Sequence, residues 1–520
     1  MKKLRHALLL VLVASAARAE DGVVKTETGE VQGRVVERNG KPVRVWKGIP
    51  YAAPPVGALR WKPPERAAAW SGVRECTKFG PACPQPALPL FETPEGQDES
   101  CLFLNVWAPA GAEKLPVMFW IHGGSYVVGS GAQTLYDGEH LARRGVVLVT
   151  INYRLGPFGF FCHRALSKES GKNASGDYGL LDQVAALEWV KRNIAAFGGD
   201  PGLVTVFGES AGAGSVGALL CSPLAKGLFH RAILESGTPF ARPLHEDARG
   251  MEAAEKTGER IARALGCDEA KDPLAALRAK SAPELLAAAS PSVNPIGEGN
   301  VFGPVIDGWV IPEDPVLVTV SGKLRDVPLL LGTTENEGSV FLLGSPAARS
   351  VEAYTKFART LFGKESGPLL EHYAAATDDD VPAALEKLVT DVYFVAPTRT
   401  VARSRRESRT WLYHFTRVSE TAKALKLGAC HGLELRYVFG TLEGSGVRDV
   451  DHALSKAMGA AWVRFARTGD PNGGDLPAWP AFTREKDEHL EFGDTIRAGS
   501  GLHRESCDLI DSAWIRLSER

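Results

Sequence analysis

LVTVFGESAGAGSVGALL, residues 203–220, joins an apolar run to a run of small residues through a glycine-rich turn. The run LVTVF (203–207) is typical of a buried parallel strand, and the small residues after Ser210 are typical of a closely packed helix. Strand, tight turn and helix form the context in which a Gly-x-Ser-x-Gly pentapeptide exposes its serine beyond a sheet. We therefore predict that Ser210 is a nucleophile, with the amide of Ala211 directed at the space above its hydroxyl.

Further apolar runs predict the sheet around this turn. They are VMFWI (117–121), VVLVTI (146–151), AIL (232–234), VPLLL (327–331) and WLYHF (411–415). The segment LDQVAALEWVKRNIAAF (181–197) has apolar residues at helical spacing and ends at Gly198-Gly199. Strands that alternate with helices favour an α/β fold with a large, mostly parallel sheet and helices on both faces. In such sheets the chemistry gathers beyond the carboxyl ends of the strands.

A nucleophilic serine needs a base to take its proton and a carboxylate to orient the base. His431, in the loop GACHGLE after WLYHF, is flanked by small residues and is the favoured base, whereas His414 lies inside a strand pattern and suits a packed position. The six histidines that follow VPLLL are His372, His414, His431, His452, His489 and His503. For the acid, Glu335 and Glu337 both follow the strand VPLLL, and periodicity does not choose between them.

A second glycine-rich turn, HGGSY (122–126), follows the apolar run VMFWI. Beside the predicted elbow at Ser210, its exposed amides suit an oxyanion hole, the set of donors that stabilises a tetrahedral intermediate.

The chain as a whole has the composition of a globular protein. It has 520 residues, of which 44% are hydrophobic and 23% charged, and its formal net charge is −2. That charge balance gives no electrostatic reason to bind nucleic acid. No low-complexity linker, charge block or repeat divides the chain, so we expect residues 20–520 to form a single domain.

The N-terminus reads as a signal peptide over residues 1–19. A basic start, MKKLRH, is followed by the apolar ALLLVLVASA and by the small-x-small site Ala17-Arg18-Ala19. The apolar run is shorter than the about 20 residues that a bilayer requires, and no later segment is a convincing membrane helix. We expect a cleaved, exported protein that is periplasmic or secreted.

The eight cysteines suggest disulfides rather than metal binding. Export favours disulfide formation. The chain has no CxxC and no clustered Cys/His spacing, so zinc is disfavoured and no metal is predicted.

Nearly the whole chain after residue 19 resembles the type-B carboxylesterases, the family that also holds the cholinesterases. The motifs that carry the resemblance, besides the two glycine-rich turns, are GIPYAAPPVGALRWKPP (48–64), ESCLFLNVWAP (99–109), NYRLGPFGF (152–160), GDYGLLDQVAALEWVKRNIAAFGGDPGLVTVFGESAGAGSVG (176–217), ESGTP (235–239), FGPVIDG (302–308), LGTTENEGSVF (331–341) and CHGLELRYVFG (430–440). The resemblance implies the α/β-hydrolase fold, with long loop and helical insertions over the active site.

The resemblance also implies the site, residue by residue. It places the catalytic triad on Ser210, Glu337 and His431, and the oxyanion amides on Gly124, Ser125 and Ala211. It therefore selects Glu337 where periodicity left two candidates. Glu209 matches the acid before the nucleophile, and Ser236 and Asp391 resemble polar residues behind the triad; ordinary capping or turn residues are the alternative for the last two.

Cysteines and departures from the family pattern refine this interpretation. The resemblance pairs Cys83 with Cys101, which in the chain-entropy model stabilises by about 3 kcal/mol. A second bridge from Cys267 lacks its partner, because Ala276 stands where a cysteine is expected.

The segment between Cys83 and Cys101 has no tryptophan for cation–π recognition of choline, so a cholinesterase is disfavoured. Ser125 replaces a third glycine, but an amide donates whatever its side chain.

The resulting prediction is a serine hydrolase of broad carboxylesterase type that cleaves carboxylic esters through an acyl-enzyme. Its expected partners are a small ester and water, and it would need no cofactor. A lipase or polyester hydrolase is a close alternative. A non-catalytic adhesion or binding protein on the same fold is the alternative from another class; such members lack part of the triad, and here all three positions are filled.

Overall fold

A computed structural model describes residues 22–518, apart from 38–40, 89–91, 93–95, 249–250, 295, 298, 344, 407–408 and 445. The predicted signal peptide, residues 1–19, lies outside the described residues. No helix in the described part of the chain combines the length and the apolar composition needed to cross a membrane.

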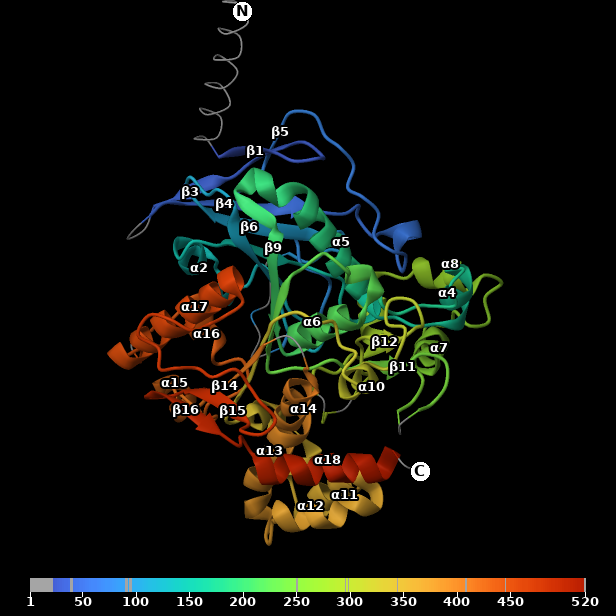
Figure 1. Cartoon of the computed structure of the whole chain (residues 1–520). Helices are drawn as coiled ribbons and strands as arrows, with labels where there is room; N and C mark the ends of the chain where they lie inside the picture. Colours follow the sequence, from blue (N-terminus) through green and yellow to red (C-terminus); the bar gives the residue numbers. More distant parts are fainter. Residues whose placement is uncertain are drawn as a thin grey trace, which may run out of the picture.

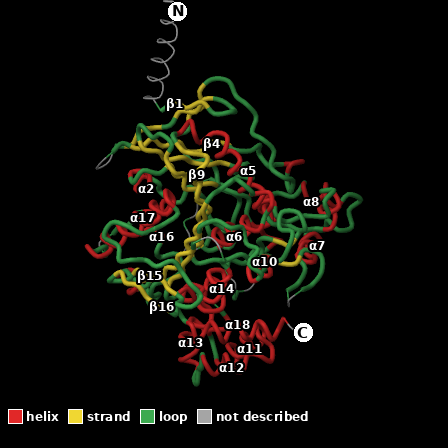
Figure 2. The backbone as a smooth tube through the Cα atoms, viewed as in Figure 1, coloured by secondary structure: helices red, strands yellow, loops and turns green. Residues whose placement is uncertain are grey.

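Eleven strands form the central sheet (Figures 1 and 2), in the order β16-β15-β14-β13-β10-β9-β7-β8-β6-β4-β3. Their bounds are β3 Arg34–Val36, β4 Val43–Pro50, β6 Phe103–Pro109, β7 Leu115–Ile121, β8 Val147–Ile151, β9 Gly199–Glu209, β10 Arg231–Glu235, β13 Leu329–Thr334, β14 Thr410–Phe415, β15 Glu488–Phe492 and β16 Ile496–Ser500. In this order, the strands from β15 to β8 are all parallel to one another. The strands at the two edges pair antiparallel with their neighbours; they are β16 at one edge and β6, β4 and β3 at the other. Every apolar run singled out in the sequence lies at one of these strands, so the predicted sheet is confirmed.

Smaller pairings lie outside this sheet. The strands β1 (Val23–Lys25), β2 (Glu30–Gln32) and β5 (Val73–Glu75) make a three-stranded sheet, and β11 (Arg242–Pro243) pairs with β12 (Val305–Ile306).

Helices cover both faces of the central sheet. The helices α5 (Tyr178–Asn193), α6 (Ala211–Cys221) and α14 (Ala396–Ser404) contribute to one buried core, and α2 (Glu139–Arg143), α16 (Leu435–Phe439) and α17 (Asp449–Thr468) to the other. Strand β7 divides its side chains between the two cores. Phe119 and Ile121 belong to the first, and Met118 and Trp120 to the second, as a period of two requires for a strand buried on both faces. The predicted two-faced α/β fold is therefore confirmed.

The helix predicted over 181–197 is α5 followed by a 3₁₀ turn at Ile194–Phe197. It ends at Gly198, whose φ of 86° is left-handed and suits a residue without a Cβ.

Two long insertions follow β10 and β13. The first holds α7 (Ala254–Ala264), α8 (Pro273–Arg278), α9 (Ala282–Ala289) and α10 (Pro315–Val320); the second holds α11 (Val351–Phe362), α12 (Ser366–His372) and α13 (Val381–Thr390). The remaining helices are α3 (Gly156–Gly159), α4 (Arg164–Glu169), α15 (Glu420–Ala424) and α18 (Arg504–Ser518). Helix α18 packs with α11, α12 and α14 at the lower end of the molecule in Figure 1. The insertions place chain beyond the carboxyl ends of the parallel strands, where the predicted site lies.

Candidate active site

Ser210 occupies the sharp turn between β9 and α6. Its backbone has φ 55° and ψ −123°, a conformation that L-residues rarely adopt, and its amide donates to the carbonyl of Glu235 on the next strand at 2.9 Å. The flanking glycines explain how the turn closes. A Cβ on Gly208 would lie 2.5 Å from the backbone of Gly212, and a Cβ on Gly212 would lie 2.0 Å from the carbonyl oxygen of Ile121. Any side chain at these two positions would force the strand and the helix apart.

His431 and Glu337 lie together beside this turn. Nδ1 of His431 is 2.5 Å from Oε2 of Glu337, which is fully buried. The other carboxylate oxygen of Glu337 accepts from the hydroxyl of Ser236 at 2.5 Å and from the amide of Thr334 at 2.7 Å. Three donors therefore hold this carboxylate, and the carboxylate orients the imidazole.

The two glutamates that periodicity left open point to different histidines. Oε2 of Glu335 lies 2.7 Å from Nε2 of His414, whereas Glu337 faces His431. Between them, Asn336 bonds the loop that carries His431: its amide donates to the carbonyl of Ala429 at 3.0 Å, and its side-chain oxygen accepts from the Ala429 amide at 3.0 Å. The structure thus brings Glu337, and not Glu335, to the predicted base.

The second ring nitrogen of His431 faces Glu209. Nε2 is 3.0 Å from Oε1 of Glu209, and neither atom has an aligned hydrogen-bond partner among the described residues. Burial alone would lower the pKa of His431, but the charges of Glu209 and Glu337 outweigh it and raise that pKa above its ordinary value. Burial raises the pKa of Glu209 to about 7. The site therefore holds an imidazole whose charged form is stabilised and whose Nε2 faces the carboxyl group of Glu209.

Two further glutamates, Glu434 and Glu235, are buried behind the triad. Glu434 lies 3.4 Å from the hydroxyls of Ser236 and Tyr413, and Oε1 of Glu235 accepts from the indole of Trp462 at 3.0 Å. Burial raises the pKa of Glu235 to about 8 and that of Glu434 well above its ordinary range. Neither glutamate was predicted as a site residue, although Glu235 stands in the motif ESGTP and Glu434 in the motif CHGLELRYVFG.

The HGGSY turn lies against the nucleophile. A Cβ on Gly123 would lie 3.1 Å from Cβ of Ser210, and Gly124 and Ser125 have left-handed φ values of 104° and 55°. Tyr153 donates to the carbonyl of His122 at 2.9 Å and so fixes the start of the turn. Gly124, Ser125 and Ser210 are partly exposed, so a ligand can reach this face.

Side chains from other segments border the site. The hydroxyl of Ser125 donates to the carbonyl of Val293 at 2.6 Å, and Asn294 donates to the carbonyl of Phe341 at 2.7 Å. The rings of Phe341 and Phe394 lie 5.1 and 4.8 Å from the ring of His431 and stack on each other. No pattern in the sequence distinguishes these two aromatic residues from core residues.

Ser236 and Asp391, both predicted to lie behind the triad, are placed differently. Ser236 contacts Glu337, as described above. The carboxylate of Asp391 accepts from the hydroxyl of Tyr373 at 2.7 Å and pairs with His503, so the structure does not bring it to the triad. The family resemblance identified Asp391 by its position in the chain. In the structure, its carboxylate faces His503, the residue before α18, and not the triad.

All eight cysteines are free thiols in the structure. Cys83 and Cys101 are buried and in contact: the side-chain hydrogen bond to Cys83 is the largest cause of a pKa of Cys101 raised well above its ordinary value. The predicted bridge between them is thus not formed here, although its two thiols are adjacent. Burial raises the pKa of Cys430 to about 11, so this neighbour of His431 is an inert thiol at neutral pH.

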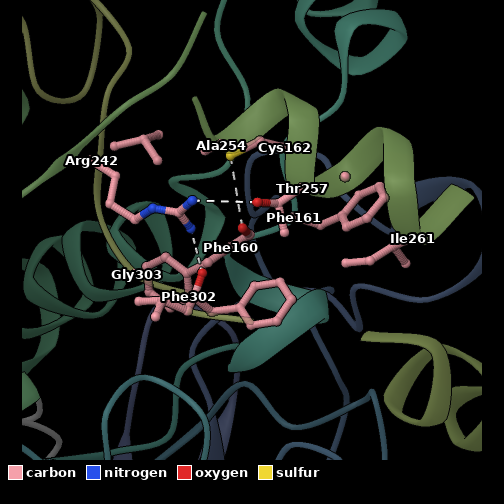
Figure 3. A pocket seen from close by; sticks show the side chains of 12 residues that line it. Phe160, Phe161, Cys162, Arg242, Ala254, Thr257, Ile261, Phe302 and Gly303 are labelled. Atoms are coloured by element: carbon pink, nitrogen blue, oxygen red, sulfur yellow. Dashed lines mark hydrogen bonds between the residues drawn. The ribbon is translucent and has the colours of Figure 1, made fainter. Parts of the chain in front are cut away.

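A small cavity near Cys162 has no triad residue in its lining (Figure 3). Its lining includes Phe160, Cys162, Arg242 and Phe302, and the guanidinium of Arg242 bonds the carbonyl of Val301. Its volume is about 10 Å³, room for no more than one water molecule.

Known proteins similar to this chain show the family to which it belongs. The model of the carboxylesterase family matches residues 20–510, so this chain belongs to that family. It is a carboxylic ester hydrolase with an α/β-hydrolase fold, as predicted.

Individual relatives cover nearly the whole chain. The chain is 41% identical to para-nitrobenzyl esterase of Bacillus subtilis (strain 168) over 91% of its own length and 95% of the relative's. It is 40% identical to fumonisin B1 esterase of Sphingopyxis macrogoltabida over 94% of its own length and 89% of the relative's. A solved structure of a PNB esterase superposes with a TM-score of 0.81 at 37% identity, covering 94% of this chain and 100% of that one.

Proposed function

We propose that Ser210, His431 and Glu337 carry out the ester hydrolysis through an acyl-enzyme. The single observation that carries this assignment is the bond of 2.5 Å between Nδ1 of His431 and Oε2 of Glu337, beside the strained turn of Ser210. The bond fixes the tautomer in which Nε2 of His431 has a lone pair. That nitrogen is the atom that takes the proton of the serine hydroxyl.

The two half-reactions use the same atoms. Oγ of Ser210 attacks the ester carbonyl while His431 takes its proton, and the imidazolium then protonates the leaving alcohol. Water enters, loses a proton to His431 and attacks the acyl carbon, and the imidazolium returns that proton to Ser210 as the acid leaves. The amides of Gly124, Ser125 and Ala211 stabilise the oxyanion in both steps; loss of one such donor typically costs about 2.7–4 kcal/mol.

Glu209 supports the imidazolium that forms in each step. Its carboxylate lies 3.0 Å from Nε2 of His431 in a largely buried setting, where charges interact more strongly than in water. Glu209 therefore acts on the charge of the base and does not itself attack the substrate.

The substrates we propose are esters with an apolar acyl or alcohol group. Phe341 and Phe394 present stacked rings beside His431, and aromatic surface of this kind favours apolar groups. The names of two relatives, para-nitrobenzyl esterase and fumonisin B1 esterase, suggest aryl esters and large natural esters as the first compounds to test.

We also propose that the chain is exported and that Cys83 and Cys101 then form a disulfide. Support comes from the signal-like residues 1–19 and from the contact between the two buried thiols. Intact mass of the protein recovered from the periplasm or the medium tests both points. A chain that begins at Glu20 and gains two hydrogens on reduction is expected; an uncleaved, fully thiol form would contradict the proposal.

The experiment that tests the catalytic assignment compares Ser210→Ala with a matched serine variant. Ser512→Ala changes an exposed serine on α18. Ser210→Ala should lose hydrolysis of a p-nitrophenyl ester and labelling by a fluorophosphonate probe while it keeps the circular dichroism of the wild type. Ser512→Ala should retain both activities. Turnover of Ser210→Ala within tenfold of the wild type would remove Ser210 from the mechanism.

A further inference from the structure

A second cluster of polar side chains lies outside the proposed catalytic residues. Three ligand atoms lie within 4.8 Å of one another: a ring nitrogen of His414, a ring nitrogen of His503 and a carboxylate oxygen of Glu335. We propose that these three residues bind a zinc ion. The site is separate from the triad, and the inference does not depend on the proposed function.

His414 presents its Nε2 to the cluster. This atom is 2.7 Å from Oε2 of Glu335, while Nδ1 of the same ring lies 3.3 Å from the hydroxyl of Thr333. The side chain of His414 is only 4% exposed, and β14 places it directly opposite Thr333 of β13. Its ring is therefore held in one orientation by strand register and packing.

His503 is oriented by a carboxylate. Nδ1 of His503 bonds Oδ1 of Asp391, and the other oxygen of Asp391 accepts from the hydroxyl of Tyr373 at 2.7 Å. Histidine ligands of metals usually donate their second ring nitrogen to a carboxylate in this way, which fixes the tautomer and leaves the other nitrogen as a lone-pair donor. The backbone of His503 is left-handed, with φ 43°, so the surrounding structure holds this side chain in place against a backbone cost.

The charge and exposure of the cluster suit a cation. Glu335 supplies one carboxylate to the cluster, and a second carboxylate, that of Asp391, lies behind His503. The side chains of Glu335 and His503 are 47% and 28% exposed, which gives an ion a route from solvent.

The donor set selects the ion. Two imidazoles and one carboxylate match the three protein ligands of an open tetrahedral zinc site, whereas Ca²⁺ and Mg²⁺ prefer oxygen ligands. With zinc–ligand bonds of about 2.0–2.2 Å, tetrahedral ligand atoms lie about 3.4 Å apart. The separation of 2.7 Å between His414 and Glu335 and the limit of 4.8 Å for the set bracket that value. An ion would replace the direct bond between His414 and Glu335.

The ligands come from three distant parts of the chain. Glu335 follows β13, His414 lies in β14, and His503 immediately precedes α18. A bound ion would therefore tie α18 to the two strand ends, one of which continues into Asn336 and Glu337. We expect zinc to raise the thermal midpoint of the protein.

Isothermal titration calorimetry with ZnCl₂, on protein first stripped with EDTA, tests the proposal. His503→Ala and Glu335→Gln alter partly exposed side chains and so should fold; His452→Ala, on the exposed face of α17, is the matched control. The wild type and His452→Ala should bind one zinc ion and gain thermal stability, while the other two variants should bind at least tenfold more weakly. No zinc binding by the wild type, or equal affinity in His503→Ala, would overturn the site.

Two additional measurements sharpen the test. Asp391→Asn should weaken zinc binding by about 10–100-fold, the usual effect of altering a residue that orients a ligand. Co²⁺ added to the stripped protein should give the intense visible absorption of tetrahedral coordination, and His503→Ala should lose it. Absorption that survives in His503→Ala would place the metal elsewhere and contradict the proposal.

Discussion

Nδ1 of His431 lies 2.5 Å from Oε2 of Glu337, although 94 residues separate them in the chain. The contact depends on two strand ends. Glu337 follows β13, and His431 stands in the loop after β14, the parallel neighbour of β13. Asn336 joins the two segments, since it pairs with Cys430 as an isolated bridge. The acid and the base are thus aligned by the sheet itself.

We predict that Glu337→Gln lowers kcat by about 10⁴-fold, because an amide at this position favours the wrong tautomer of His431. Stopped-flow or steady-state hydrolysis of a p-nitrophenyl ester measures the loss. Glu352→Gln, on the exposed side of α11, is the control and should keep the wild-type kcat. A loss below tenfold in Glu337→Gln would show that the carboxylate does not orient the base.

The pH dependence of kcat/KM should depend on Glu209. His431 must be neutral to act as a base, so activity falls as the pH drops through its raised pKa. The charge of Glu209 favours the imidazolium and raises that pKa; its removal therefore lowers the pKa. In Glu209→Gln the acidic limb of the profile should move to lower pH, while Glu188→Gln, an exposed residue of α5, leaves it in place. An acidic limb that moves to higher pH would contradict the assignment.

The sequence was sufficient to predict the sheet and the turn of Ser210. Strands such as β7 are buried on both faces and so appear as continuous apolar runs, and the glycines beside Ser210 are required by distances as short as 2.0 Å. Both features depend on residues that are close in the sequence, so a short sequence pattern is enough to predict them.

Contacts between distant segments could not be predicted in the same way. Glu335 and Glu337 follow the same strand, and only the three-dimensional course of the turn sends one to His414 and the other to His431. Asp391 occupies the expected position in the chain, yet its carboxylate turns to His503. Glu335, His414 and His503 are far apart in the sequence, whereas zinc motifs are recognised by ligands a few residues apart. The lack of such a motif in the sequence therefore could not exclude this cluster.

Ser236 should contribute to both stability and catalysis. Its hydroxyl donates to the fully buried Glu337 at 2.5 Å, and a hydrogen bond to a charged group is typically worth about 1.5–3 kcal/mol. Ser236→Ala should lower the free energy of unfolding by that amount and also lower kcat. Urea unfolding and ester hydrolysis measure the two effects. Unchanged stability together with unchanged kcat would show that Thr334 and His431 suffice to hold the carboxylate.

A strict steric requirement lies at Gly212, two residues after the nucleophile. A Cβ there would lie 2.0 Å from the carbonyl oxygen of Ile121 in β7, a backbone atom that cannot rotate away. Gly212→Ala should therefore lower the free energy of unfolding by about 1–3 kcal/mol and reduce kcat at least tenfold, because α6 and Ser210 must shift together.

Gly367, in α12, is the matched control for this substitution. A Cβ there would meet no heavy atom within 4 Å, and its φ is not in the left-handed region. Gly367→Ala should change the free energy of unfolding by less than about 1 kcal/mol, because the smaller conformational entropy cost of alanine in a helix is opposed by its clash with Pro368, and it should leave kcat unchanged. Thermal unfolding and p-nitrophenyl ester hydrolysis of the two variants give the comparison. If Gly212→Ala behaves like Gly367→Ala, the turn is not held by the close approach of the helix to β7.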